Sequence, residues 1–305
     1  MTALMRRAFY IKLFSCVICG LFGAVTAADT VAITRDAPFV WLKAINNATT
    51  SGVKNRDIDG ATAALLFPLV SQQPPQQIEA NFERQFKLLQ EIPVACSGKK
   101  IYTPERARLG HFSDIPQLFS VGLRLFVVKD SAYAEIIAEL AKAGRLSMAT
   151  LANSLPRLMV GAVAGRSYTP QLDDVLQQFA STKRLWLRSA EDMASGMTQM
   201  LVSQRVDAIV EYPTIMADFS PDNTDKVFVS YQIIETPAFT DGYILCAATP
   251  QGEALVKRFN AAIRERSQQR DYLDAHLQWF EPARHNEILA YYNKVYGTHF
   301  VLDEH

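Results

Sequence analysis

An arginine at the start of a predicted short helix is the residue in this chain best suited to binding an anion. In the stretch 101–114, Thr103 suits the N-cap of a helix and Pro104 suits its first position. Arg106 then falls in the first turn, where the helix dipole disfavours a cation by roughly 0.3–1 kcal/mol. The planar guanidinium and the free N–H groups of the helix start would together suit a carboxylate. The same spacing also fits a surface ion pair of Arg106 with Asp114 or with the preceding glutamate.

A second turn has the form of an anion cradle. The buried strand predicted at 158–164 stops at Gly165, and hydroxyl groups, including that of Ser167, precede the next helix. The turn is not a P-loop, because three residues separate Gly161 from Gly165 and Arg166 stands where a lysine would be needed. A tight turn with Arg166 on the surface is the alternative interpretation.

Residues for catalysis are less clearly patterned. Glu211, Asp114 and His111 are the candidate acid–base groups if the protein is an enzyme. The sequence shows no nucleophile elbow, no zinc-binding pair at helical spacing and no cysteine–histidine signature. The other histidines, interpreted as surface or core-edge residues, are His276, His285, His299 and His305. The sequence therefore favours binding over catalysis and predicts no metal site and no cofactor.

The elements around these residues indicate an α/β fold. Strands are predicted at 30–34, 92–96, 121–129, 158–164, 205–213, 227–230 and 242–248. Helices are predicted at 61–70, 78–89, 133–143, 172–179, 190–203, 255–263, 272–280 and 287–295. Phe39 and Trp41 are expected in a loop after the first strand.

The first 28 residues have the pattern of a signal peptide. Three cations, Arg6, Arg7 and Lys12, come before an apolar run at 13–25, and small residues at 26–28 suit cleavage. The run is too short for a comfortable membrane span. We therefore expect an exported, soluble mature protein that does not span a membrane.

The mature chain carries a small negative charge. The full chain has 31 Lys and Arg and 31 Asp and Glu, so removing three cations leaves 28 against 31, a net charge of −3. Nucleic-acid-binding proteins concentrate basic residues instead, so a nucleic-acid partner is not expected. About 277 mature residues exceed one ordinary core and suggest two lobes. Cys96 and Cys246 alone remain after cleavage, and either a disulfide or two buried thiols fits them.

The arginine stretch resembles a known family signature. Thr103-Pro-Glu-Arg106 followed by Phe112-Ser113-Asp114 is similar to the Thr-x-x-Arg…Phe-Ser signature of the periplasmic solute-binding proteins of extracellular family 3. The resemblance extends weakly over nearly the whole mature chain. It is nearest to a branch of uncharacterised secreted proteins that share a cysteine before this motif and a later Gly-Arg-Ser-Tyr, here residues 165–168.

The resemblance implies a two-lobed, type II periplasmic binding fold, in which each lobe is a mixed sheet flanked by helices and two hinge crossings join the lobes. Lobe 1 would comprise 29–128 and 240–305, and lobe 2 would comprise 129–239. Cys96 and Cys246 would lie on neighbouring strands of one lobe. The implied location is the periplasm, and the implied partners are a small anionic solute and an inner-membrane transporter or sensor.

The resemblance also implies a set of ligand-binding residues. Arg106 and Thr103 would hold a carboxylate, an aromatic ring after the first strand would stack on the ligand, and Arg166 would face Arg106 across the cleft. The complete set is Arg106, Thr103, Phe39, Trp41, Ser97, Arg166, Ser167 and Tyr212. Lys99 and Lys100, next to Ser97, are expected to be solvated.

One position departs from the family pattern. Amino-acid binders usually carry an aspartate five residues after the position of Asp207, where it pairs with the ligand's ammonium, and this chain has Tyr212 there. Glu211 should point away from the direction of Tyr212, because a strand alternates its side chains. A free amino acid is therefore a doubtful ligand. The alternatives are a protein of this fold that acts through protein–protein contacts and, less favoured, a lyase or dehydratase on the same scaffold.

Overall fold

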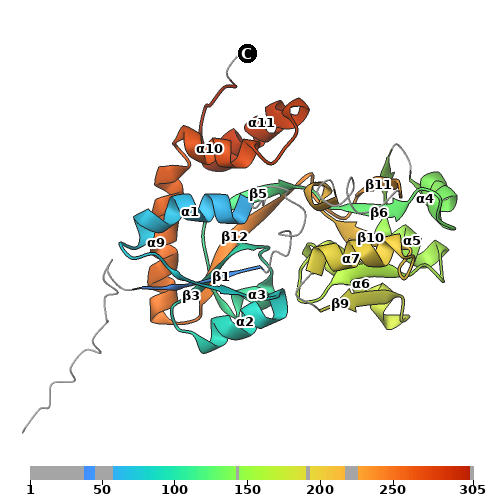
Figure 1. The fold of residues 1–305 in the computed structure, drawn as a ribbon, viewed down its shortest axis with the longest axis horizontal. Helices are drawn as coiled ribbons and strands as arrows, with labels where there is room; N and C mark the ends of the chain where they lie inside the picture. The colour runs from blue at the N-terminus through green and yellow to red at the C-terminus, as the bar shows by residue number, and fades with distance from the viewer. Residues whose placement is uncertain (1–37, 45–57, 142–143, 190–192, 217–225, 303–305) are drawn as a thin grey trace, which may run out of the picture. The chain divides into compact units, whose positions relative to one another are not determined.

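Two six-stranded β-sheets flanked by helices make up this protein in the computed structural model (Figure 1). The structure describes residues 38–44, 58–141, 144–189, 193–216 and 226–302. The predicted signal peptide and the strand predicted at 30–34 lie outside the described residues. The described residues from 38 onward belong to one compact unit that contains both sheets. Within the described ranges, no helix combines the length and the apolar character that a membrane crossing requires.

The first sheet has the strand order β2-β1-β3-β12-β4, and β5 pairs with β12 outside this path. Its strands are β1 (Val40–Lys43), β2 (Gln76–Glu79), β3 (Ala95–Lys100), β4 (Gly110–Phe112), β5 (Leu118–Val121) and β12 (Phe239–Ala247). Its helices are α1 (Ile58–Val70), α2 (Phe82–Glu91), α3 (Pro104–Ala107), α9 (Pro250–Arg266), α10 (Arg270–Leu277) and α11 (His285–Tyr296), with η2 (Pro282–Arg284) before α11. β1 runs parallel to β2 and β3, whereas β12 is antiparallel to β3, β4 and β5.

The second sheet has the order β7-β11-β6-β10-β8-β9. Its strands are β6 (Arg124–Val128), β7 (Arg145–Leu146), β8 (Val160–Val163), β9 (Leu185–Arg188), β10 (Ala208–Glu211) and β11 (Phe228–Ile233). Its helices are α4 (Ala134–Leu140), α5 (Met148–Ser154), α6 (Pro170–Ser181) and α7 (Met193–Val202). β8 is parallel to β9 and β10, and β6 is antiparallel to β10 and β11. Both sheets are therefore mixed, as the resemblance implies.

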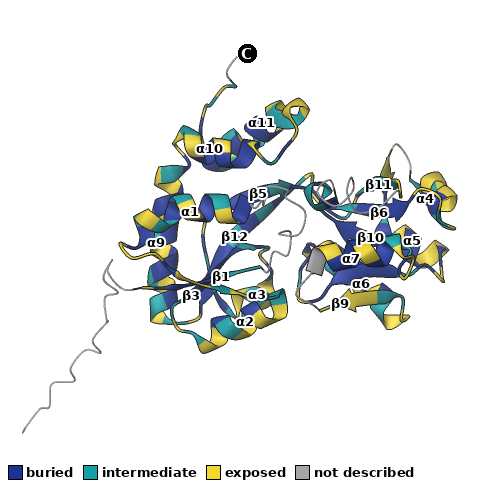
Figure 2. Ribbon diagram, in the orientation of Figure 1, coloured by how far each residue is buried: buried dark blue, intermediate teal, exposed yellow. Residues whose placement is uncertain are grey.

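Each sheet has its own apolar core. In Figure 2 most strands are buried, while the helices show exposed outer faces. Phe119 and Tyr292 pack around His276 in the core of the first sheet. Burial lowers the pKa of His276 to about 4, although a hydrogen bond with the Tyr272 carbonyl opposes this. His276 is therefore a neutral core residue.

Two connections between the sheets run next to each other. Gly122, between β5 and β6, donates its N–H to the carbonyl of Ala238, which precedes β12, at 2.7 Å. A Cβ on Gly122 would lie 2.2 Å from the Pro237 carbonyl oxygen, so only glycine permits this approach. Residues 124–128, which we expected in the first lobe, pair in the second sheet. The chain therefore changes sheet about six residues earlier than expected.

A disulfide joins the two central strands of the first sheet. Cys96 of β3 and Cys246 of β12 are direct partners in the antiparallel ladder, and their sulfur atoms are bonded. The placement on neighbouring strands is confirmed. Of the two alternatives that the sequence left open, the structure has the disulfide and not the pair of buried thiols.

Two further local expectations differ from the structure. Trp41 lies in strand β1 and Phe39 directly precedes it, where we expected a loop. The helix expected from residue 78 begins only at Phe82, and Gln76–Glu79 pairs as strand β2. The side chain of Asn81 explains this start, because its oxygen accepts the N–H of Arg84 and so caps the helix.

Candidate functional site

Arg106 lies on α3, as the capping pattern predicts. The Thr103 hydroxyl accepts the Arg106 N–H at 3.2 Å and caps the helix. The guanidinium donates from Nη1 to the Ile101 carbonyl at 3.1 Å and from Nη2 to the Gly165 carbonyl at 3.0 Å. It also lies over the Phe86 ring, 4.8 Å from the ring centroid. A half-buried cation is thus held by neutral groups.

No described acidic residue forms an ion pair with Arg106. Asp114 instead accepts from Asn260 at 2.9 Å and from Arg264 at 3.3 Å, so it does not make the surface ion pair that was the alternative interpretation. Burial lowers the pKa of Arg106 to about 10, and the charge of Asp173 opposes this shift. An anion placed at this guanidinium would stabilise its charged form.

The contact between Arg106 and Gly165 depends on a close backbone approach. Gly165 follows β8 with φ of +71°, in the left-handed region that favours glycine. A Cβ at this position would lie 2.8 Å from Cγ of Glu83 and 2.9 Å from its backbone nitrogen, at the start of α2. The glycine therefore lets the turn after β8 reach the Arg106 side chain from the other sheet.

Arg166 is committed to a buried ion pair. Its Nη1 and Nη2 atoms each donate to one Glu211 oxygen at 2.8 Å, and the Glu211 side chain is 1% exposed. The guanidinium also lies over the rings of Tyr168 and Tyr212, at 5.1 and 4.8 Å from their centroids. Burial alone would lower the pKa of Arg166, but the Glu211 carboxylate outweighs burial and raises it. The surface arginine that was the alternative for this turn is excluded, and the guanidinium is directed to Glu211.

The second anion cradle is filled by the chain itself. The Asp173 carboxylate accepts the Ser167 hydroxyl at 2.6 Å and the Tyr168 N–H at 2.8 Å. Thr169 caps α6 by accepting the Leu172 N–H. Strand, glycine turn and helix start do form an anion-binding geometry, but the carboxylate within it belongs to the protein. Ser167 therefore has no free hydroxyl proton to offer a ligand.

Both aromatic candidates lie in the core of the first sheet. Phe39 is 1% exposed and Trp41 is 2% exposed. Each makes ring contacts with Phe67 and Phe259, at centroid distances between 5.2 and 5.7 Å. Stacking on a ligand requires an accessible ring face, so this burial argues against the role that the resemblance implied.

Ser97 and Tyr212 are also internal. The Ser97 hydroxyl lies 2.7 Å from the Leu42 carbonyl and 3.0 Å from Oε1 of Gln85. Tyr212 is buried. Two cations lie over its ring: Arg166, from the turn after β8, and the Lys99 ammonium group, which is 5.5 Å from the ring centroid. Ser97 stabilises the sheet, whereas Tyr212 lies at the edge of a group of cations.

Lys100 is the residue that sequence reasoning missed. It was expected in solvent, yet it is 3% exposed. Its ammonium group donates to Gln85 Oε1 at 2.7 Å and to the Gly98 carbonyl at 3.0 Å, and it lies 5.2 Å from the centroid of the Phe82 ring. Burial lowers the pKa of Lys100 to about 7; Asp59 opposes this shift.

No simple strand pattern would have placed Lys100. The strand expected at 92–96 runs to residue 100, and regular alternation would put Lys100 on the face of Cys96. The pairing with β12 is irregular between Ser97 and Lys100, however, and Lys99 has φ of +55°. Lys100 therefore lies on the other face, where it shares the partner Gln85 of α2 with Ser97.

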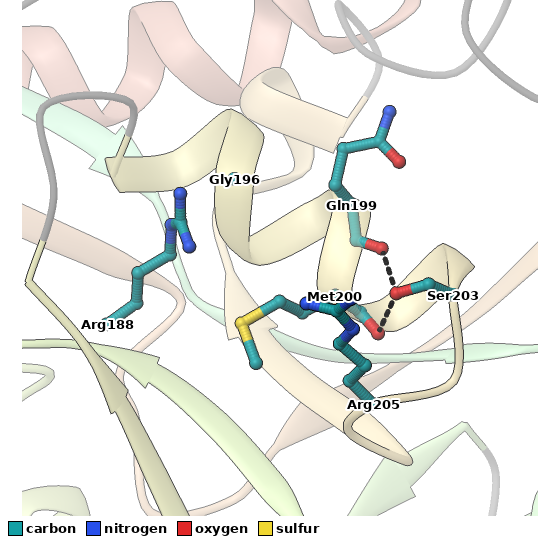
Figure 3. A pocket seen from close by; sticks show the side chains of 6 residues that line it. All are labelled: Arg188, Gly196, Gln199, Met200, Ser203 and Arg205. Atoms are coloured by element: carbon teal, nitrogen blue, oxygen red, sulfur yellow. Dashed lines mark hydrogen bonds between the residues drawn. The ribbon is translucent and has the colours of Figure 1, made fainter.

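A separate cavity of ≈ 310 Å³ lies between the end of β9 and α7 (Figure 3). It is lined by Arg188, Gly196, Gln199, Met200, Ser203 and Arg205. The Ser203 hydroxyl bonds to the carbonyls of Gln199 and Met200 on its own helix, at 2.8 and 3.3 Å. None of the predicted ligand-binding residues lines this cavity, so it is distinct from the Arg106 region.

Solved structures share the fold of this chain. The substrate-binding protein of an amino acid ABC transporter is 16% identical, with a TM-score of 0.58 over 80% of this chain and 98% of its own. A histidine kinase sensor domain with similarity to periplasmic binding proteins is 15% identical, with a TM-score of 0.58 over 81% and 97%. An ancestral amino acid-binding protein, a precursor of cyclohexadienyl dehydratase, is 18% identical, with a TM-score of 0.55 over 81% and 96%.

Sequence comparisons give no closer assignment. No protein-family model matches the chain, and no curated protein matches it. The structural likenesses cover nearly the full length of each matched protein and extend across both sheets of this one. The chain therefore has the two-lobed fold of type II periplasmic binding proteins.

Proposed function

We propose that this chain is an exported solute-binding protein that holds a small carboxylate-containing solute at Arg106. The observation that carries the proposal is the half-buried guanidinium, whose described hydrogen-bond partners are two backbone carbonyls. A carboxylate could accept two parallel N–H bonds from it and supply the missing counter-charge. In the proposed mechanism, the ligand takes the place of the Gly165 carbonyl, and the two lobes then close around it.

Export to the periplasm is part of the proposal. The composition of residues 1–28 supports it, and so does the Cys96–Cys246 disulfide, because disulfides persist in oxidising compartments. The likenesses to a transporter component and to a sensor domain support delivery of the solute to an inner-membrane transporter or sensor.

Thermal-shift measurements on the mature protein test the proposal. Amino acids, aliphatic and aromatic acids, dicarboxylates and small peptides would each be added, and a ligand at a hundred times its Kd stabilises the native state by ~2.7 kcal/mol. Arg106→Ala should abolish the shift, while Arg108→Ala, an exposed arginine at the end of the same helix, should retain it. A ligand that stabilises the wild type and Arg106→Ala equally would contradict a site at Arg106.

A protein–protein interaction module is the second candidate. It is favoured by the internal roles of Phe39, Trp41, Ser97, Ser167 and the Arg166–Glu211 pair, which leave few of the predicted residues for a ligand. It would gain support if a folded protein showed no shift with any member of the library.

Catalysis receives less support from the site. Glu211 is held by Arg166, and Asp114 is held by Asn260 and Arg264. Among the described residues, no hydrogen bond or ion pair joins either carboxylate to His111, so the acid–base candidates are not linked. The likeness to a dehydratase precursor keeps a lyase on this scaffold as a lesser alternative, but the chain offers it no assembled acid–base pair.

A further inference from the structure

Two cations of the first sheet, Lys100 and Arg106, lie near each other. The carboxylate proposed above binds Arg106 and leaves Lys100 without a role. Lys100 on β3 and Arg106 on α3 lie close enough for the charge of Arg106 to lower the pKa of Lys100. Phe82 and Phe86, one helical turn apart on α2, support them: Lys100 lies over the Phe82 ring and Arg106 over the Phe86 ring. One helix face therefore fixes the spacing of both charges.

The acidic residues near Lys100 and Arg106 form hydrogen bonds with other partners. Glu211 is bonded to Arg166 through both oxygens, and Asp173 caps the turn before α6. Asp59, whose charge acts on Lys100 from α1, accepts from Gln117 at 2.9 Å. None of these carboxylates forms an ion pair with Lys100 or Arg106 within the described ranges.

A third cation increases the positive charge of the region. Lys99 has φ of +55°, its N–H donates to Gln117 Oε1, and its ammonium group lies over the Tyr212 ring. Its charge also acts on Lys100. Burial and these two cations disfavour the charged form of Lys100, the Asp59 charge opposes them, and a further anion would favour the charged form.

We propose that the solute is a small dianion without an ammonium group, such as an aliphatic dicarboxylate, with one carboxylate at Arg106 and the second at Lys100. Residues one helical turn apart lie roughly 5–6 Å from each other, so the two supporting rings suggest a similar separation of the two carboxylates. An ammonium group would meet Lys99 and Lys100 where the second carboxylate finds its partner. This inference rests on the proposed function and names the solute class of that same site.

Calorimetric titration tests the inference with named probes. Malonate, succinate, glutarate and adipate vary the separation of the carboxylates, while monomethyl succinate removes one charge from the ligand and leaves the protein unchanged. Butyrate and glutamate add a monoacid and an amino acid. We expect succinate or glutarate to bind most tightly, and monomethyl succinate to bind roughly 10- to 100-fold more weakly, as for the loss of one charged hydrogen bond.

Variants separate the two charges. Lys100→Met should weaken the best dicarboxylate by a similar factor and leave monomethyl succinate unchanged, whereas Arg106→Ala should weaken both. Lys87→Met, an exposed lysine on α2, is the matched control and should bind as the wild type does. Circular dichroism confirms that each variant is folded.

A second readout follows from burial of Lys100. In the free protein its charged neighbours are Lys99 and Arg106, which disfavour its proton, and Asp59, which favours it. A second carboxylate would draw a proton onto this amine at pH 8. Titration in two buffers of different ionisation enthalpy should therefore show proton uptake with wild-type protein and none with Lys100→Met.

The outcomes distinguish this inference from the proposed function. Tight binding of butyrate or glutamate that needs Arg106, with no effect of Lys100→Met and no proton uptake, would overturn the inference and leave the function standing. Failure of every carboxylate to bind a folded protein would overturn both.

Discussion

Replacement of Lys100 by methionine should stabilise this protein at low pH and lose that effect at high pH. The pKa of Lys100 falls from 10.5 to about 7 on folding because the amine is buried. Each pKa unit corresponds to 1.36 kcal/mol, so the buried charge costs the native state about 5 kcal/mol when both states are protonated. Methionine has a similar length and no charge, and it removes this cost.

A smaller loss opposes this gain. Without the ammonium group, the Gly98 carbonyl loses a donor, and Gln85 Oε1 shares the single Ser97 hydroxyl proton with the Leu42 carbonyl. An unsatisfied buried acceptor costs about 1–3 kcal/mol. Below pH 7, Lys100→Met should therefore be more stable than the wild type by about 2–4 kcal/mol.

The pH dependence has a defined sign. Below pH 7 the lysine is protonated in both states, so the full cost is present. Between pH 7 and 10.5 the native amine has lost its proton while the unfolded amine retains it, so the wild type's free energy of unfolding rises with pH. The stability gained by Lys100→Met should therefore decrease across this window. At the highest pH the variant should be less stable than the wild type, because only the loss of its hydrogen bonds remains.

Urea unfolding followed by circular dichroism measures the difference in free energy of unfolding between the proteins. It would be run from pH 6 to pH 10 on the wild type, Lys100→Met and the surface control Lys87→Met. Other titrating groups are common to all three proteins and cancel. A difference between the wild type and Lys100→Met that stays constant across the pH range would refute the reasoning, because it would mean that Lys100 keeps an ordinary pKa in the folded protein.

Two further predictions concern the structural supports of the site. Glu211→Gln leaves Arg166 buried without its counter-charge and should lower the free energy of unfolding by about 3–5 kcal/mol in urea titration, whereas a loss below ~1 kcal/mol would show that the pair is not buried in solution. Replacing both Cys96 and Cys246 by alanine removes a link across 150 residues and should lower stability by about 2–5 kcal/mol in thermal unfolding; an unchanged Tm would argue that the bond does not form.

Local sequence patterns predicted many of the helices, strands and turns. The cap at Thr103 and the helix after it depend on neighbouring residues, and the structure has both where the spacing predicts them. Helix α6 follows in the same way from its i, i+3, i+4 apolar spacing, because a helix buries one face whatever its partner. The turn at Gly165 was likewise readable as an anion-binding geometry from its residue types alone.

Tertiary structure decided which partner each polar or aromatic side chain received. No local pattern shows that Asp173 fills the cradle at Ser167, that Glu211 takes Arg166, or that Lys100 turns inward while Arg106 keeps only carbonyl partners. These contacts join separate elements, and burial changes the energy of a charge more than any neighbour in sequence does. The sequence by itself determined the α/β elements and the arginine on its capped helix; the packing of two sheets decided which charges are already paired and which remain for a ligand.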